Sequence, residues 1–347
     1  MEIRSPIRLA SACCVVFLGL LTLSDASHAH SKTDIITLTN GDDVTGEIKG
    51  LLQGRLSFST DSMGTVQVEW EDVVGVKSDF DYEVRLVNGV RYYGSIADAA
   101  EPGTVRVVAE DGEYVVAVLD VVELRELEES VADRFDIRLG LGYSYAKAAD
   151  VGSFTLTSEL SYQDKRGVTG LKGRTSRTDQ VGENVSSNRY TLSRQFWTRR
   201  PQVVRWLDGS YEDNDELDLD YRYTLGFGLG KAFVDNNKQS LIGFVGFQGA
   251  SERSLEQASF NSVEGVLGGN YALWRFDTPE IELAFNITAY PGITESGRWR
   301  GNSDIRLSWE LVEDFFWDIS AWATYDNQSQ SGTDTDYGVT TGLGWTY

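Results

Sequence analysis

The last two thirds of the chain consist of segments of about ten to fourteen residues in which apolar side chains alternate with small or polar ones, a pattern typical of barrel strands. The clearest apolar series is Phe135, Ile137, Leu139, Leu141, Tyr143 and Tyr145. Alternate residues of a strand share one face, so this series faces one side, and small or charged residues face the other. Beyond residue 30 no apolar run approaches the roughly 20 residues of a membrane helix. The pattern predicts an all-β chain with a transmembrane antiparallel up-and-down barrel over residues 134–347.

The alternation predicts about twelve strands, at 134–147, 153–164, 167–179, 188–199, 202–213, 217–234, 239–251, 258–275, 280–292, 301–312, 315–327 and 336–347. The expected connections alternate in length: short ones at 165–166, 200–201, 235–237, 277–279 and 313–314, longer polar ones near 180–187, 252–257, 293–300 and 328–335. Short periplasmic turns and long outer loops produce this alternation, and an even strand number returns the last strand to the periplasmic side.

The final strand has an apolar face that ends on aromatic residues. Tyr337, Val339, Leu343, Trp345 and Tyr347 share one parity. This end resembles the C-terminal signal by which outer-membrane barrels are recognised for insertion. We therefore expect Trp345 and Tyr347 to act as the insertion signal, with the barrel assembly machinery, outer-membrane lipid and lipopolysaccharide as partners. The expected location is the cell outer membrane of a Gram-negative envelope.

The N-terminus predicts a secretory signal peptide over residues 1–29. Its features are basic Arg4 and Arg8, an apolar core over residues 9–23 and a small-residue exit at 27–29. A lipoprotein signal ending before Cys13 is the alternative, although few apolar residues precede that cysteine. After processing no cysteine remains and His30 is the only histidine, which excludes disulfides, thiolate zinc sites and cysteine nucleophiles. The net charge of −22 argues against nucleic acid as a partner.

A tandem repeat occupies residues 32–129, as two units over 32–81 and 82–129. Leu38-Thr-Asn-Gly41 recurs as Leu86-Val-Asn-Gly89, and the segment from Trp70 recurs from Val118, both at a spacing of 48 residues. Asn-Gly between alternating apolar runs is a strong hairpin signal. Each unit therefore predicts a small SH3-like or Sm-like barrel, and together they predict a periplasmic β module with an unknown ligand. The charged segment 123–129 predicts a short helix or linker.

The acids of the first unit could in principle gather a divalent cation by oxygen ligation, but their spacing fits no calcium-binding loop. We predict no metal, no cofactor and no catalytic residue in the chain. The acids are Asp42, Asp43, Glu47, Glu69, Glu71 and Asp72.

The inner wall of the predicted barrel carries charges of both signs. The candidates are Asp136, Arg138, Asp218, Asp220, Arg222, Asp304 and Arg306. They either form a salt-bridge network that closes the lumen or line a path that selects ions. Twelve strands fall between the filled barrel of about eight strands and the water-filled porin of about 16 to 18, so the strand number leaves both open.

Two further features concern the outer face. Tryptophans near segment ends predict an interfacial girdle: Trp197, Trp206, Trp274, Trp299, Trp309, Trp317, Trp322 and Trp345. Arg194 shares its parity with apolar Leu192 and Phe196. A lipid-facing arginine at mid-depth costs about 2 to 4 kcal/mol. Either the register slips there, Arg194 lies near a headgroup, or the strand count differs.

The segment Tyr211–Gly230 resembles the signature of a bacterial outer-membrane family, domain of unknown function 481, sometimes labelled salt-induced outer membrane protein. The specific part is Tyr221-Arg222 followed by Leu225-Gly-Phe-Gly-Leu-Gly230. The resemblance covers about residues 134–347, and the Asn-Gly-Asp module also recurs in members of that family. It implies an outer-membrane barrel and transfers no catalytic residue. Lys231 stands where an aromatic residue is usual.

The sequence favours a non-enzymatic outer-membrane barrel that is either a narrow channel for ions or small solutes, as a porin would be, or a closed structural or binding barrel. A rim-active barrel hydrolase is an alternative, but its general base is usually a histidine, and only His30 survives processing. A soluble secreted β-sandwich or adhesin is the other alternative. It shares the alternation and the signal peptide.

Overall fold

The computed structural model describes residues 31–127, 134–146, 151–180, 183–215, 219–254, 259–328 and 334–345. The predicted signal peptide, His30, Asp218 and Tyr347 lie outside these ranges. The described residues form strands and two 3-10 turns, Trp70–Asp72 (η1) and Val118–Asp120 (η2). No helix among them combines the length and apolar character needed to cross a membrane. The fold is all-β, as the alternation predicts.

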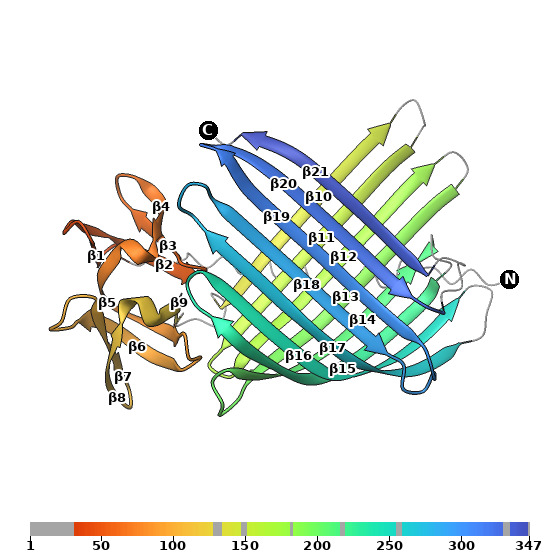
Figure 1. Cartoon of the computed structure of the whole chain (residues 1–347), viewed down its shortest axis with the longest axis horizontal. Helices are drawn as coiled ribbons and strands as arrows, with labels where there is room; N and C mark the ends of the chain where they lie inside the picture. Colours follow the sequence, from red (N-terminus) through yellow and green to blue (C-terminus); the bar gives the residue numbers. More distant parts are fainter. Residues whose placement is uncertain are drawn as a thin grey trace.

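The first nine strands form the N-terminal module, residues 31–127, drawn in red to gold in Figure 1. They are Asp34–Leu38 (β1), Asp43–Leu52 (β2), Arg55–Thr60 (β3), Gly64–Glu69 (β4), Val73–Leu86 (β5), Arg91–Asp98 (β6), Thr104–Ala109 (β7), Gly112–Ala117 (β8) and Val121–Glu126 (β9). Their order is β4-β3-β2-β1-β5-β6-β7-β8, and β9 pairs with β2 and β5.

The two sequence repeats pack as one body around the long strand β5. Its first half pairs with β1, and its second half pairs with β9, so β5 ends one repeat and begins the next. Equivalent positions touch across the centre: Trp70 Nε1 donates to the Val118 carbonyl at 2.8 Å, and the Tyr82 hydroxyl donates to Asp34 at 3.1 Å, both 48 residues apart. Such contacts indicate an approximate two-fold axis. The SH3-like or Sm-like assignment of each unit remains a prediction.

The apolar core of the described residues lies in the module. It joins both repeats and includes Ile36, Phe58, Trp70, Val84 and Val107. The helix or linker predicted from residue 123 is wrong as far as residue 126, because this segment continues β9. Leu124 is buried opposite Val84, whereas Glu123 on the other face pairs with Arg85. Alternation and cross-strand pairing outweigh the charged composition.

The remaining twelve strands form one antiparallel sheet, the barrel sheet, in sequential order. They are Phe135–Ala146 (β10), Val151–Asp164 (β11), Gly167–Gln180 (β12), Glu183–Trp197 (β13), Val203–Asn214 (β14), Leu219–Asp235 (β15), Gln239–Ser254 (β16), Phe260–Arg275 (β17), Ile281–Pro291 (β18), Trp299–Val312 (β19), Phe315–Asp326 (β20) and Thr335–Trp345 (β21). The predicted number of twelve strands is confirmed.

The sheet curls into two facing walls with opposite tilts (Figure 1). The described residues of β10 and β21 form no ladder with each other, so the fold is barrel-like with two unpaired edge strands.

One predicted connection is wrong. The long loop expected at 180–187 is largely strand, because β12 runs to Gln180 and β13 begins at Glu183, with these two residues as partners in the ladder. The apolar alternation ends earlier than the backbone pairing. Polar hairpins continue beyond an apolar band, and sequence alternation does not detect this continuation.

Candidate functional site

The module lies against the end of the barrel sheet where the short connections gather (Figure 1). The connection between β15 and β16 shows this contact best. Asn237 Nδ2 donates to the carbonyls of Leu119 and Val121 at 3.0 Å each. The β2–β3 turn approaches the same connection so closely that a Cβ on Gly54 would lie 2.4 Å from the Asn237 carbonyl oxygen.

A second turn of the module contacts the β13–β14 connection. A Cβ on Gly89 would lie 2.6 Å from the Pro201 carbonyl oxygen. Gly41, the equivalent residue of the first repeat, has nothing within 4 Å of its Cβ position. The two repeats therefore have different roles, and the Asn-Gly turn of the second repeat is the one that docks.

Charged side chains add to the contact. Arg85 forms ion pairs with Glu123 of the module and Asp235 of the barrel sheet. The Arg91 guanidinium lies 3.8 Å from the ring centre of Trp197 and 2.8 Å from Glu83.

Glu83 links the module to β11. It accepts a hydrogen bond from Gln163 at 3.0 Å. Burial raises the pKa of Glu83, with Gln163 opposing that shift. Burial also raises the pKa of Tyr93 to about 12, close to Lys165 of the β11–β12 connection.

The module also contacts the β17–β18 connection. Arg55 lies 3.5 Å from the ring centre of Phe276 and 3.6 Å from Glu280.

The carboxylates of Glu69, Glu71 and Asp277 lie within 4.8 Å of one another, which is close enough for a shared cation. Lys238 Nζ already lies 2.7 Å from Glu71, so an ammonium supplies positive charge there. The prediction of no metal stays untested.

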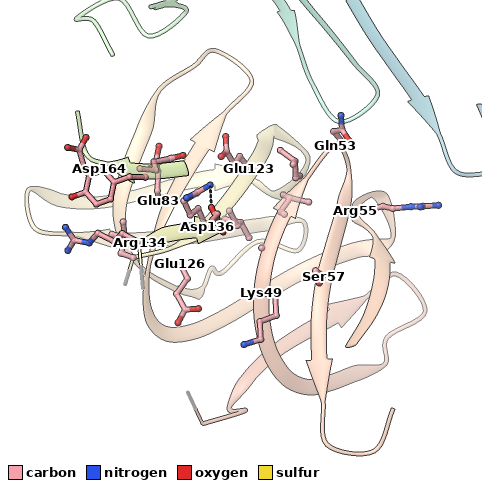
Figure 2. A pocket seen from close by; sticks show the side chains of 18 of the residues that line it. Lys49, Gln53, Arg55, Ser57, Glu83, Glu123, Glu126, Arg134, Asp136 and Asp164 are labelled. Carbon is pink, nitrogen blue, oxygen red and sulfur yellow. Dashed lines mark hydrogen bonds and ion pairs between the residues drawn. The ribbon is translucent and has the colours of Figure 1, made fainter. Parts of the chain in front are cut away.

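A polar crevice of about 1050 Å³ separates the module from the edge of the barrel sheet at β10–β12. Figure 2 shows Lys49 and Arg55 on one side of it, with Glu83, Glu123 and Asp136 on the other. Arg125 Nη2 lies 3.8 Å from a carboxylate oxygen of Asp136. Charges of both signs line the crevice, so water and small ions have room beside the module.

A second cavity, of about 590 Å³, lies inside the sheet beneath the module. We call it the lumen cavity. Its inner wall includes Trp197, Trp206, Asp208, Phe244, Gln248 and Tyr290. The indole nitrogens of Trp197 and Trp206 are buried without a hydrogen-bond partner among the described residues.

The glycines of the sequence motif make room for Trp206. A Cβ on Gly228 would lie 2.6 Å from the Trp206 ring, and one on Gly246 would lie 2.5 Å from it. Gly226 is similarly close, at 3.1 Å. Because these glycines face inward while Phe227 and Leu229 are exposed on the outer face, the motif places an indole on the inner wall.

Ion pairs cluster near the long-connection ends of the strands. Arg222 donates to Glu252 at 2.7 Å and lies 3.5 Å from buried Glu212. Arg300 forms a two-contact pair with Glu264, which is almost completely buried. These pairs lie at the end of the barrel sheet opposite the module.

The other predicted inner-wall charges are distributed along the sheet. Arg138 lies opposite Glu159 in the ladder, and Lys172 Nζ lies 2.8 Å from that carboxylate. Asp304 accepts from Asn286 at 2.8 Å. Asp220 pairs with Arg253.

Three predicted residues remain. Arg306 lines a separate cavity next to Asp318. Asp136 faces the crevice. Asp218 lies outside the described residues. The structure therefore brings Arg222 into an ion-pair cluster and leaves the seven candidates without a common site. Of the predicted insertion signal, Trp345 is exposed beside Phe315, and Tyr347 lies outside the described residues.

The tryptophan girdle is only partly present. Trp309, Trp317 and Trp345 share one face near the short connections, as expected for a girdle. Trp197, Trp206, Trp274 and Trp322 share the opposite, inner face. The two groups of tryptophans differ in parity within their strands. Trp206 has the same parity as the charged residue Asp208, and this can be read from the sequence. Trp206 and Asp208 are thus site residues that the search for charges missed.

Arg194 lies on the outer face, and its exposed neighbours confirm the predicted parity. It is three residues from the end of β13, and its guanidinium lies 3.0 Å from Asp164 and 2.6 Å from the Thr169 hydroxyl. The regular pairing of β13 and the twelve strands leave the position near a headgroup as the remaining explanation, which stays a prediction.

Comparison with known proteins gives one result. No curated protein matches the chain. The family described as "Protein of unknown function, DUF481" matches residues 139–347, more than half of the chain. The matched region covers the barrel sheet. It includes Trp206 and the inward-facing glycines beside its ring. The chain belongs to the DUF481 family.

Proposed function

We propose that this protein is a non-enzymatic outer-membrane β-barrel whose lumen is capped on the periplasmic side by its own N-terminal module. The observation that carries the proposal is the docking of the module on four short connections, through Lys165, Pro201, Asn237 and Glu280. A module attached only by a linker would lack these contacts. The cap restricts passage to small ions and solutes.

The outer face of the barrel sheet supports a membrane location. Large apolar side chains are exposed along its strands, including Leu141, Leu225, Phe227 and Val339. Exposed apolar area of this extent is unfavourable in water and marks contact with lipid or another apolar surface. A soluble β-sandwich would bury that face against a second sheet.

The polar crevice supports restricted passage over complete closure. It lies beside the docked module and carries Asp136 and Arg138 from the predicted inner wall. Ions can leave the lumen along this route without displacing the module, whereas larger solutes require the cap to shift. A low conductance that increases on undocking follows from this geometry.

The experiment compares two equivalent glycines. Gly89→Ala places a Cβ against the Pro201 carbonyl oxygen, whereas Gly41→Ala has the same kind of positive φ (+79° and +88°) and meets no atom within 4 Å. Both variants therefore strain a module turn, and only Gly89→Ala strains docking. Refolded mature protein is reconstituted in planar bilayers, with folding checked by heat-dependent gel mobility.

We expect a small conductance in the wild type, a clear increase in Gly89→Ala and no change in Gly41→Ala. Equal conductance in all three proteins would contradict the capping role. Silence in all three, with folding intact, would contradict passage of ions. Wild-type protein that remains soluble without detergent would contradict the membrane location.

A further inference from the structure

The lumen cavity has the size and the lining of a small-molecule site. Its volume of about 590 Å³ falls within the range of roughly 300 to 1,000 Å³ that ligand sites occupy. Trp197, Trp206, Phe244 and Tyr290 supply aromatic surface, while Asp208 and Gln248 supply polar atoms. Aromatic surface with a few convergent polar groups is the usual composition of such sites.

The cavity holds one carboxylate without a partner among the described residues. Asp208 is half-buried and forms no hydrogen bond or ion pair with any described residue. Arg85 is shared between two carboxylates, Glu123 and Asp235, which leaves one further negative charge. Arg91 is balanced by Glu83. A partly desolvated carboxylate without a partner favours a cation beside it.

The aromatic rings favour a cation with an organic body. Arg91 already places its guanidinium over Trp197, so a cation–aromatic contact is part of this wall. Among the described residues no cation lies over Trp206, although the same cavity exposes its ring and Asp208 is two residues away in β14. A positive group between Asp208 and Trp206 would complete the arrangement.

We infer that the lumen cavity binds a small organic ammonium ion. Asp208 pairs with the cationic head, and the face of Trp206 covers its alkyl groups. The inference rests on the proposed capped barrel, because the module forms one side of the cavity through Arg85 and Arg91. It goes beyond the capping role, since it names the chemical class that the lumen holds.

The test uses the refolded mature protein in detergent micelles and choline as the probe. Isothermal titration calorimetry measures choline affinity for the wild type, Asp208→Asn and Asp318→Asn. Asp318 is the matched control, because it is a carboxylate on the same inner face that lines a different cavity. Glucose and acetate are the neutral and anionic comparison ligands.

We expect choline to bind the wild type, Asp208→Asn to weaken binding by about tenfold or more, equal to about 1.4 kcal/mol, and Asp318→Asn to leave it unchanged. Asp208→Glu, which keeps the charge, should retain binding if Asp208→Asn fails to fold. Equal affinity in the wild type and Asp208→Asn, or preference for glucose or acetate over choline, would overturn the ammonium site.

The outcome is separable from that of the capping proposal. Absence of choline binding together with a conductance increase in Gly89→Ala would reject the ammonium site and retain the cap. Choline binding that depends on Asp208, with no effect of Gly89→Ala on conductance, would reject the cap and retain the site.

Discussion

The module and the barrel sheet differ in where their apolar side chains lie. The module buries them in a core, whereas the barrel sheet exposes them on its outer face. In the module, Phe58, Trp70 and Val107 are completely or almost completely buried in a shared core. In the barrel sheet, Leu225 and Val339 point outward and are exposed, while charged residues such as Glu264 are buried inside. Both regions are antiparallel sheets with the same period-two alternation. The difference lies in which surroundings each apolar face requires.

This comparison shows that alternation alone identifies a strand and not its environment. The module satisfies its apolar face internally, so it is suited to water. The barrel sheet leaves its apolar face uncovered over a continuous outer surface, which only lipid, detergent or another protein can cover. The contrast is the physical basis of the proposed membrane location.

The largest expected effect comes from placing a charge on the two kinds of exposed apolar position. Leu225→Arg puts a charge on the outer face of β15 at a residue that is 61% exposed. If lipid covers this face, the substitution should destabilise the folded barrel by about 2 to 4 kcal/mol. Urea unfolding in lipid vesicles, followed by gel mobility, measures the loss.

Val115→Arg provides the matched control in the module. Val115 is 65% exposed, close to the value for Leu225, but we expect water beside it. Surface substitutions of this kind usually change the free energy of unfolding by less than about 0.5 kcal/mol. Equal, small losses in both variants would remove the distinction between the two surfaces.

The next effect concerns the inner wall. A Cβ on Gly228 would lie 2.2 Å from the Val245 carbonyl oxygen and 2.6 Å from the Trp206 ring, whereas one on Gly342 would meet nothing within 4 Å. Gly228→Ala should therefore destabilise the barrel sheet by about 1 to 3 kcal/mol, because backbone and indole both have to move. Gly342→Ala should be neutral. Urea midpoints of the two variants and near-ultraviolet circular dichroism of the indole provide the measurement.

The strands could be predicted from the sequence more completely than the candidate site. Twelve strands follow from apolar alternation because lipid-facing residues repeat at every second position. The polar extension of β12 and β13 was missed because backbone pairing continues where apolar side chains stop. The charged composition of residues 123–129 predicts a helix or linker and hides the strand β9, although Val122 and Leu124 alternate with Glu123 and Arg125.

The candidate site was harder to predict. Arg222 and Asp304 were found by parity, since charge on the inner face of a strand is visible in sequence. The lumen cavity was not found, because Trp206 was assigned to a girdle from its nearness to a strand end. Docking of the module depends on Arg55, Gly89 and Asn237, which are unrelated in sequence and meet only in three dimensions. No spacing rule connects them.

We expect pH to have a smaller, graded effect on the docking of the module. Burial raises the pKa of Glu83, and burial followed by Asp277 of the β17–β18 connection raises the pKa of Glu69. Raised pKa values in the docked state mean that docking takes up protons. Docking should therefore be strongest below the ordinary carboxyl value of 4.5 and weaken as pH rises through the raised values, with no further change above them.

Conductance of the Gly89→Ala protein reports this effect, and it should decrease as pH falls. Glu69→Gln should reduce the pH response, whereas Glu110→Gln, in the exposed β7–β8 turn, should not. A conductance that rises at low pH in all variants would contradict the assignment of the proton uptake to docking.

The smallest expected effect distinguishes depth on the outer face. Arg194→Gln removes a charge from the same face as Leu225, but near the end of β13. Asp164 would keep hydrogen bonds from the backbone N–H groups of Arg166 and Gly167, both at 2.9 Å, so its carboxylate is not left alone. Charges near the interface cost about 0 to 1 kcal/mol, so the free energy of unfolding in vesicles should change by less than about 1 kcal/mol. A loss as large as that of Leu225→Arg would mean that Arg194 lies at a depth where its pair with Asp164 is essential, and that the apolar band extends further toward the module than the exposed side chains indicate.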